Sequence, residues 1–409
     1  MTVHIIGGGV AGLAAAVGCV QSGVDVALYE ASPHLGGRCR SYRHTEFGCD
    51  LDNGAHAVLS NNKAVARYLS ALGAADRLQS YGQNGLSFID VRDSAPWRLQ
   101  IPQCLWNPAA RPPGTTAWDI LAGAQLAYNV GTTARALSAT PNATEKLWEP
   151  LCTAALNTPL TEADSSLLAP VLRGMAMPGG LRHGLKLPVV SLSHTYIEPA
   201  ESWLASQGVV INRQSPVRKI GVAAGAVAYL IFDKLELSIT HTDSVILAVP
   251  PWSPLLAQLD IHTEALALSP IVNLHFQVVA DVSDDFIGLI GGLSQWLWVH
   301  NGIATVTISA ADDLMAIESE LIAARVWSEI ALILSQDPSA AAPVHVVKER
   351  RATLRHSAGV NQYRPPVNTH VMNLFLAGDW INTGLPCTLE SAMQSGFSAA
   401  MGCLKRGFR

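Results

Sequence analysis

A glycine-rich turn near the N-terminus constrains the fold more than any other feature of the sequence. Residues 3–6 form a short apolar run, as buried parallel strands do, and lead directly into a G-x-G-x-x-G sequence at 7–12. An alanine-rich segment follows at 13–20, and a second apolar run at 24–29 ends at Glu30. Because alanine favours helix, this order predicts strand, helix and strand: a Rossmann-like βαβ unit in an α/β protein.

The spacing within this unit fits a dinucleotide site. Gly7 permits the tight turn, Gly9 lets the backbone approach a pyrophosphate, and Gly12 lets helix and strand pack closely. The N–H groups at a helix start bind anions, and a carboxylate about 20 residues downstream accepts a ribose hydroxyl. An ordinary βαβ unit is the alternative, because glycines also mark plain strand–helix turns. The predicted cofactor contacts are Gly7, Gly9, Val10, Ala11, Gly12, Glu30 and Ala31.

Two later segments add candidate contacts. Adjacent glycines at 36 and 37 again allow close approach of backbone to ligand, and the arginine that follows can pair with a phosphate or hold a flavin edge. Residues 50–56 form a polar, glycine-containing turn in an otherwise apolar chain. These segments contribute Gly36, Gly37, Arg38, Asn53, Gly54, Ala55 and His56.

The C-terminal region offers a second strand-and-helix pair. Residues 373–379 are typical of a buried strand ending in Gly378 and Asp379, and a helix is expected from about 388 to 402. A strand-end aspartate can bind a ribityl hydroxyl, and the positive N-terminus of a helix suits the negative charge of a reduced flavin. Small residues would let this helix pack closely on neighbouring backbone: Ala392, Ser395, Gly396 and Ala399.

Charge is scarce, which first raises the question of a membrane span. Charged residues make up 14% of the chain, against about 25% in typical soluble domains. The two long uncharged stretches are interrupted, 3–20 by five glycines and 286–311 by Asn301-Gly302, a hairpin signal. We therefore expect no transmembrane helix and no signal peptide. The net charge of −5 excludes a polycationic nucleic-acid binder.

The number and spacing of the cysteines indicate the redox state of the compartment and whether a metal site is expected. The seven cysteines are dispersed and include no CxxC pair. Such a pattern suits free thiols in a reducing cytoplasm, and neither a disulfide framework nor a metal site.

In combination, these segments resemble a known superfamily. The unit at 7–30, Leu-Gly-Gly-Arg at 35–38 and Leu-Ala-Gly-Asp at 376–379 are similar to the flavin amine oxidases and phytoene desaturases. Further segments resemble the squalene-associated FAD-dependent desaturases, which are bacterial hydroxysqualene dehydroxylases of hopanoid precursor synthesis. These segments are 147–159, 187–192, 248–253, 270–276, 378–380 and 383–386.

The resemblance covers nearly the whole chain and implies a non-covalently bound FAD. It also implies cofactor contacts at Leu385, Pro386 and Leu389, and at Val217 through its backbone. Two features depart from the patterns of these relatives. Ala55 stands where the family usually has glutamine, which leaves only a backbone contact there. Amine oxidases use a lysine near the flavin, and the apolar segment 265–280 has none, which argues against amine oxidation.

The same resemblance implies a domain division. A Rossmann-like FAD-binding domain, discontinuous in sequence, would take 1–80, 186–250 and 345–409. A mixed α+β substrate domain would take the two insertions, 81–185 and 251–344. Within these regions we expect helices at 116–137, 161–175, 198–207 and about 313–334, and strands at 209–211, 215–220, 229–233, 235–239, 245–249, 271–279 and 303–309.

The insertions are poor in charge and contain most of the tryptophans, which suits an apolar substrate. Squalene chemistry comes from the resemblance alone. It implies that a tertiary or allylic hydroxyl leaves as water with the help of an acid, while reduced FAD delivers a hydride to the carbon. The candidate acids are His56 and Glu390. Their alternatives are a hydrogen-bonded structural histidine and a favourable charge at a helix N-terminus.

Partners follow from this hypothesis. The FAD needs an electron donor, and because long isoprenoids reside in bilayers, the helical insertion 81–185 is expected to dock on the inner membrane surface without crossing it. The alternative functions are a flavin amine or porphyrinogen oxidase and a carotenoid-type desaturase. The alternatives that are not flavoenzymes are a non-catalytic flavin or isoprenoid carrier and a plain NAD-binding domain.

Overall fold

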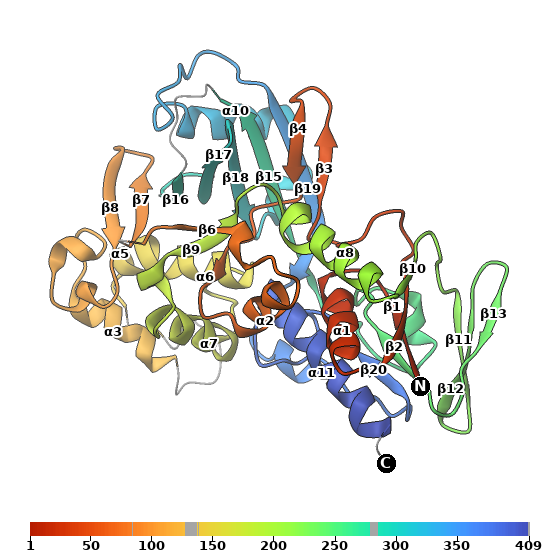
Figure 1. Ribbon diagram of the computed structural model, residues 1–409. Coiled ribbons are helices and arrows are strands. Elements are labelled where there is room, and N and C mark those ends of the chain that lie inside the picture. The colour runs from red at the N-terminus through yellow and green to blue at the C-terminus, as the bar shows by residue number, and fades with distance from the viewer. Residues whose placement is uncertain (84, 127–136, 138, 279–284, 408–409) are drawn as a thin grey trace.

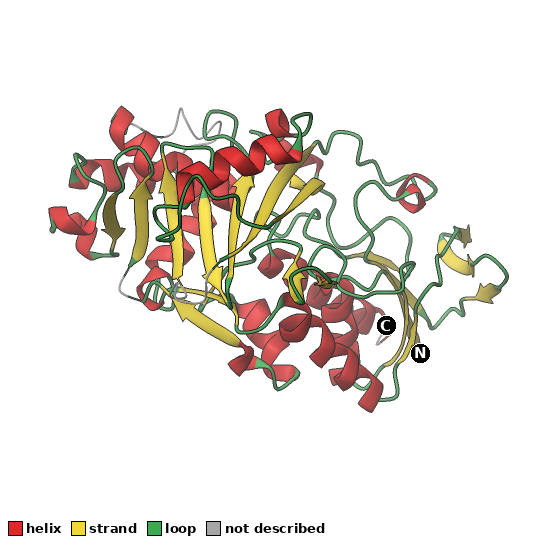
Figure 2. Ribbon diagram, turned by 90° about the horizontal axis from the view of Figure 1, so that it is seen from above, coloured by secondary structure: helices red, strands yellow, loops and turns green. Residues whose placement is uncertain are grey.

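The structure is a computed structural model that describes residues 1–83, 85–126, 137, 139–278 and 285–407 (Figure 1). Two main β-sheets lie at different ends of the molecule, with helices packed around and between them (Figure 2). The N-terminus and the C-terminal helix lie together beside the smaller of these two sheets (Figure 1).

The smaller sheet is parallel and has the predicted Rossmann-like arrangement. Its strand order is β10-β2-β1-β14-β20, and every neighbouring pair is parallel. The first two strands flank the glycine turn, and the other three come from distant parts of the chain. The bounds are β1 Thr2–Ile6, β2 Asp25–Tyr29, β10 Val210–Asn212, β14 Ser244–Leu247 and β20 Leu374–Leu376.

Four helices share a core with one face of this sheet. They are α1 (Val10–Gln21), α2 (Lys63–Ala71), α8 (Glu198–Ser206) and α11 (Leu389–Gly407). Helices α1 and α11 lie against each other (Figure 1). A Cβ at Gly396 would lie 2.1 Å from the Ala11 carbonyl oxygen, so the predicted close packing of the C-terminal helix is confirmed.

The larger sheet has the order β19-β15-β18-β17-β16-β7-β8. The predicted Asn301-Gly302 hairpin joins β17 to β18; φ is 49° at Asn301 and 74° at Gly302, as a primed two-residue turn requires. Helix α10 (Ser319–Ile330) shares a core with one face of the sheet. The bounds are β7 Leu86–Asp90, β8 Ala95–Leu99, β15 Leu268–Gln277, β16 Asp285–Ile290, β17 Trp296–His300, β18 Ile303–Ser309 and β19 Val344–Leu354.

Smaller sheets complete the strand list. The predicted hairpin at 229–239 is present as β12 and β13, but β11 begins only at residue 219, where 215–220 was expected. The reason is that the N–H groups of Gln214 and Ser215 donate to Ser32 and Glu30 carbonyls, which ties this segment to the end of β2 instead of to β12. The bounds are β3 Ser41–His44, β4 Cys49–Asp52, β5 Val58–Leu59, β6 Leu78–Tyr81, β9 Leu185–Pro188, β11 Lys219–Ala223, β12 Ala226–Ile231 and β13 Glu236–Ser238.

The first insertion is less helical than predicted, because it also contributes β7 and β8 to the edge of the large sheet. Its helices include α3 (Ala117–Gln125), α6 (Glu149–Leu156) and α7 (Ser165–Ala176). Most of the second half of the helix expected at 116–137 lies outside the described residues. Strand β19 begins at Val344, so the start of the last segment predicted for the FAD domain belongs to the large sheet.

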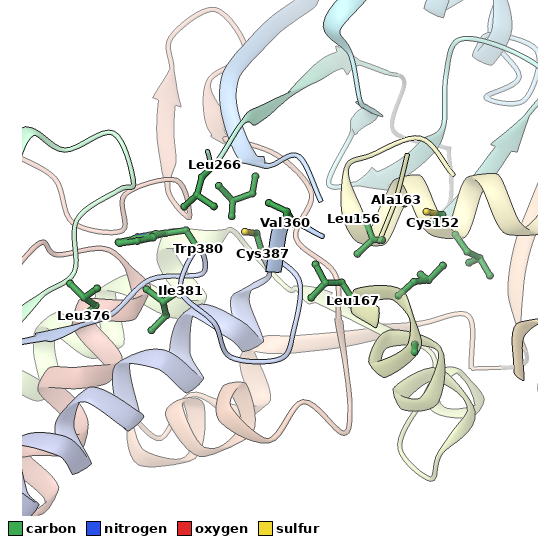
Figure 3. Packing of buried hydrophobic residues seen from close by; sticks show 14 of the residues in the cluster. Cys152, Leu156, Ala163, Leu167, Leu266, Val360, Leu376, Trp380, Ile381 and Cys387 are labelled. Atoms are coloured by element: carbon green, nitrogen blue, oxygen red, sulfur yellow. The ribbon is translucent and has the colours of Figure 1, made fainter. Parts of the chain in front are cut away.

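One hydrophobic core connects the C-terminal segment to these helices. Figure 3 shows Trp380 and Cys387 in the same cluster as Leu266, with Leu156 of α6 and Leu167 of α7 nearby. Trp380 is fully buried, and its indole N–H donates to the Val249 carbonyl at 2.8 Å. This packing fixes the loop after β20 between the parallel sheet and the helical insertion.

Candidate active site

The glycine turn between β1 and α1 leaves a cradle open at the helix N-terminus. Gly7 has φ +111°, and a Cβ there would lie 2.3 Å from the Ala248 carbonyl oxygen; a Cβ at Gly12 would lie 1.9 Å from the Gly7 carbonyl oxygen. Gly9 differs, since a Cβ there would meet no atom within 4 Å. The first and third glycines therefore serve the packing of the protein itself. The space in front of Gly9, beside the N–H groups of α1, fits a pyrophosphate.

Glu30 and the second glycine pair adjoin this cradle. The Glu30 carboxylate accepts from the Gly8 N–H at 2.7 Å and from the Ser32 N–H at 2.8 Å. The Gly36 N–H donates to the Gly8 carbonyl at 2.8 Å, and the positive φ of Gly36 and Gly37, 99° and 59°, explains why glycines occur there. Ala31 follows Glu30 directly, and Val217 lies two residues beyond Ser215, whose N–H donates to the Glu30 carbonyl.

An ion pair joins a segment near the N-terminus to a segment near the C-terminus. An Arg38 guanidinium nitrogen lies 2.6 Å from an Asp379 carboxylate oxygen, 341 residues away, at the end of β20. Burial alone would lower the pKa of Arg38, but the Asp379 charge and hydrogen bond raise it. Gly378 precedes the aspartate with φ +153°, and its N–H donates to the Ser395 hydroxyl of α11 at 2.8 Å. Asp379 is thus held beside the predicted cofactor contacts that come from the N-terminal part of the chain.

The turn at 53–56 opens onto a cavity of about 360 Å³. The Asn53 side-chain amide donates to the Arg38 carbonyl at 3.2 Å, which joins this turn to the ion pair. The cavity is bounded on one side by predicted cofactor contacts and on the other by helices α6 and α7 and one face of the large sheet. The predicted contacts that line it are Arg38, Asn53, Gly54, Ala55, His56, Leu385, Pro386 and Leu389.

His56 lines this cavity, and the pKa of its imidazole is lowered. Burial and the Arg38 charge together lower this pKa to about 4, while the Asp379 charge opposes the shift. A histidine acts as a general acid through its imidazolium form. A lowered pKa favours the neutral imidazole, which suits hydrogen bonding more than proton donation, and the role of His56 as an acid stays a prediction.

Glu390, the second candidate acid, is a helix cap. Both of its carboxylate oxygens accept from the Ala64 N–H at 3.0 Å, and one also accepts from the Val65 N–H at 3.0 Å. These are N–H groups of the first turn of α2, where negative charge is favourable. This arrangement fits the alternative interpretation, a favourable charge at a helix N-terminus, although the helix is α2. Glu390 also lines the cavity, and its role as an acid stays a prediction.

This capping role gives a testable expectation. We expect Glu390→Ala to lower the free energy of unfolding by about 1–2 kcal/mol, as loss of a helix cap does, in urea denaturation followed by circular dichroism. Glu390→Gln should reoxidise the reduced flavin with substrate at the wild-type rate. A hundredfold slower reoxidation in a folded Glu390→Gln variant would instead support Glu390 as the acid.

Three residues that sequence reasoning missed organise the site. Arg364 is 3% exposed and donates to four backbone carbonyls of the loop 379–385. His356 is buried between the Leu156 carbonyl, 2.6 Å from Nδ1, and the Cys387 N–H, 3.0 Å from Nε2; burial lowers its pKa to about 4. Glu349 of β19 lines the cavity. None of the three lies in a recognisable motif. The only sequence feature that could have indicated them is that each is a polar residue in a largely apolar chain.

The described part of the chain lacks two kinds of feature. Among these residues, no group of three or more His, Cys, Asp or Glu side chains is placed to hold a metal ion. No helix there is both long and apolar enough to cross a membrane. All seven cysteines are free thiols.

Comparison with known proteins gives two family matches and full-length relatives. Residues 5–72 match the NAD(P)-binding Rossmann-like domain, and residues 299–404 match the flavin containing amine oxidoreductase family. A hydroxysqualene dehydroxylase from Zymomonas mobilis is 36% identical over 97% of each chain. One from Sinorhizobium fredii is 34% identical over 97% of each chain.

Solved structures agree on the fold. A putrescine oxidase triple mutant superposes with a TM-score of 0.74 at 17% identity, over 99% of this chain and 100% of that one. Cyclohexylamine oxidase from Brevibacterium oxydans gives 0.68 at 15% identity, over 100% of this chain and 99% of that one. The full-length relatives, the two family matches and the fold together confirm the predicted resemblance: this chain belongs to the hydroxysqualene dehydroxylase family, within the superfamily of flavin-containing amine oxidoreductases.

Proposed function

We propose that this protein is a FAD-dependent oxidoreductase that removes the hydroxyl group of hydroxysqualene reductively and yields squalene. The observation that carries the proposal is the cavity itself, which begins at the cofactor contacts and continues between apolar side chains of the insertions. The names of the full-length relatives supply the substrate. Residues 81–185 and 251–344, which we take as the substrate domain, supply most of the cavity's apolar walls.

The residues around the cradle fit FAD. The α1 N-terminus and Gly9 would hold the pyrophosphate, Glu30 the adenosine ribose, Asp379 the ribityl chain, and the turn at 53–56 with Leu385 the ring. When bound, the flavin supplies a hydride. Burial raises the pKa of the Cys387 thiol to about 12, and a protonated thiol is a poor nucleophile, which supports non-covalent binding. The apolar walls exclude water from the reacting carbon.

An anaerobic experiment tests this function. The bound flavin is photoreduced, hydroxysqualene is added in detergent, and lipid extracts are examined by gas chromatography with mass detection. We expect squalene to form in step with flavin reoxidation. Reoxidised flavin without squalene, or no reaction, contradicts the proposal. Oxygen consumption with putrescine or cyclohexylamine would point to an amine oxidase instead.

We further propose that the first insertion contacts the surface of a lipid bilayer, from which the substrate would come. A separate electron donor would reduce the flavin. Trp106 is 66% exposed and Trp118, at the start of α3, is 79% exposed. Segments 103–105 and 117–125 pack together, so the two indoles belong to one region. Asp119 is the one acidic residue in 100–144, and its buried carboxylate accepts from Thr116 and Thr140. Exposed tryptophan without acidic neighbours suits a membrane interface.

Vesicle flotation tests this contact. We expect the protein to float with liposomes containing phosphatidylglycerol, and the double variant Trp106→Ser/Trp118→Ser to bind at least about tenfold more weakly, because each indole buries apolar surface in the bilayer. Leu321→Ser on α10 is the matched control, since this side chain is 65% exposed on another element. Equal flotation of all three proteins, or of none, would contradict the contact.

A further inference from the structure

One face of the large sheet forms the floor of the cavity, and its side chains change from polar to aromatic from strand to strand. The register places Ile271 between Glu349 on β19 and Ser309 on β18, and it pairs Thr307 with Asn273 on one side and Trp296 on the other. Along the sheet, the polar and aromatic residues that line the cavity are Glu349 and Thr353, Asn273, Thr307 and Ser309, Trp296 and Phe286, and Ile271 lines it between Glu349 and Ser309.

The polar end of this floor adjoins the predicted flavin contacts. The Asn273 side-chain amide donates to the Asn53 carbonyl at 3.1 Å, and a Cβ at Gly54 would lie 2.9 Å from the Asn273 amide nitrogen. Arg38, which also lines the cavity, donates to the Ala352 carbonyl of β19. Strands β15 and β19 are therefore the part of the sheet that lies closest to the turn at 53–56.

Hydrogen-bonding capacity remains free at this polar end. The Asn273 side-chain oxygen accepts from the Thr307 hydroxyl at 2.8 Å, so these two groups are engaged with each other. One carboxylate oxygen of Glu349 accepts from the Arg351 N–H at 3.2 Å. The other oxygen of Glu349 and the Ser309 hydroxyl have no hydrogen-bond partner within the described ranges. Polar groups that face a largely apolar cavity are expected to bond a partner there.

The aromatic end is suited to hydrocarbon. Phe286 and Trp296 stack with ring centroids 5.2 Å apart, and Phe88 packs against Trp296 at 5.6 Å. Strand β16, which carries Phe286, is the third strand from β15, which corresponds to about 14 Å at the usual strand spacing. The floor therefore offers a polar anchor beside the cofactor contacts and an apolar surface leading away from them.

We propose that Glu349 binds the hydroxyl group of the substrate and donates the proton with which that oxygen leaves, while Ser309 holds the hydroxyl from the other side of Ile271. This inference rests on the proposed function. The carbon–oxygen bond would break as the oxygen takes a proton from the Glu349 carboxyl group and leaves as water, and the carbon would take up the hydride that a bound reduced flavin supplies. This transfer would leave the flavin oxidised, and a proton from solvent would return to Glu349. The product has no hydroxyl for this anchor and is bound more weakly.

Binding to the oxidised holoenzyme tests the anchor without turnover. Shifts in the flavin absorbance are titrated with hydroxysqualene and with squalene in the same detergent. We expect the alcohol to bind about 10- to 100-fold more tightly than the hydrocarbon, because only the alcohol can form the hydrogen bonds to Glu349 and Ser309. Glu349→Ala should abolish most of this preference and Ser309→Ala a smaller part. Equal preference in wild type and Glu349→Ala would overturn the anchor.

Single turnover of the photoreduced enzyme tests the proton transfer. Glu349→Gln keeps a hydrogen bond to the hydroxyl but carries no acidic proton, so we expect near wild-type affinity and reoxidation slowed about 100-fold or more. Glu320→Gln is the control, because this side chain is exposed in the first turn of α10. Wild-type reoxidation by a folded Glu349→Gln variant overturns the inference. If wild type itself makes no squalene, the proposed function fails, and the binding preference still decides whether Glu349 is a hydroxyl anchor.

Discussion

Replacing Arg364 by leucine should release the bound flavin and lower the free energy of unfolding by at least about 3 kcal/mol. The guanidinium donates to the carbonyls of Asp379, Trp380, Ile381 and Leu385 at 2.8, 3.2, 2.6 and 2.7 Å. Each buried acceptor left without a donor costs about 1–3 kcal/mol. Leucine leaves three such carbonyls, because the Asp379 carbonyl also accepts from the Ser391 hydroxyl at 3.4 Å. The same carbonyls belong to the loop that presents Asp379 and Leu385 to the cofactor site, so stability and flavin retention should fall together.

Two further variants serve as comparisons for this expectation. Arg364→Lys keeps the charge, but an ammonium has three donors, so it can satisfy only part of the set, and we expect an intermediate loss. Arg173→Leu removes an exposed arginine of α7 and should change stability by less than about 0.5 kcal/mol. Flavin content is read from absorbance after gel filtration, and stability from urea unfolding. A yellow Arg364→Leu protein with wild-type stability would show that the loop holds its shape without this arginine.

The parts of the site that sequence reasoning predicted are those in which local backbone geometry demands a residue type. Gly7 and Gly36 need glycine because φ is positive there, at 111° and 99°, and the Asn301-Gly302 turn needs its residues for the same reason. Such requirements act within a few residues of the chain. They are therefore visible in a single sequence, and they led to the correct βαβ unit, the second glycine pair and the hairpin of the large sheet.

The parts that escaped prediction depend on contacts between distant segments. Glu390 caps a helix that begins 327 residues earlier, at Lys63, and nothing near either residue indicates the other. Arg364 donates hydrogen bonds to backbone carbonyl groups. Because every residue has such a group, the partners of Arg364 cannot be identified from the sequence. Glu349 reaches the cavity because β19 pairs with β15 in one particular register. A shift of that register by one residue would turn its side chain to the other face.

The sharpest test of the cofactor site compares two glycines of one turn. Gly9→Ala should weaken FAD binding at least about 100-fold, which corresponds to about 2.7 kcal/mol. In the cofactor-free protein its Cβ meets no atom within 4 Å, and its φ of −71° and ψ of 173° are open to any residue. We therefore expect the cofactor-free stability to change by less than about 1 kcal/mol, the cost of a poorer helix N-cap.

Gly12→Ala, in contrast, should lower the free energy of unfolding of the cofactor-free protein. Its Cβ would lie 1.9 Å from the Gly7 carbonyl oxygen, a backbone atom that cannot move without shifting β1, and overpacking of this kind costs about 2 kcal/mol or more. The higher helix propensity of alanine returns about 1 kcal/mol at most. Urea unfolding of flavin-free protein and FAD titration separate the two effects. If Gly9→Ala binds FAD as wild type does, the pyrophosphate does not pass in front of Gly9, because the added methyl group would occupy that space.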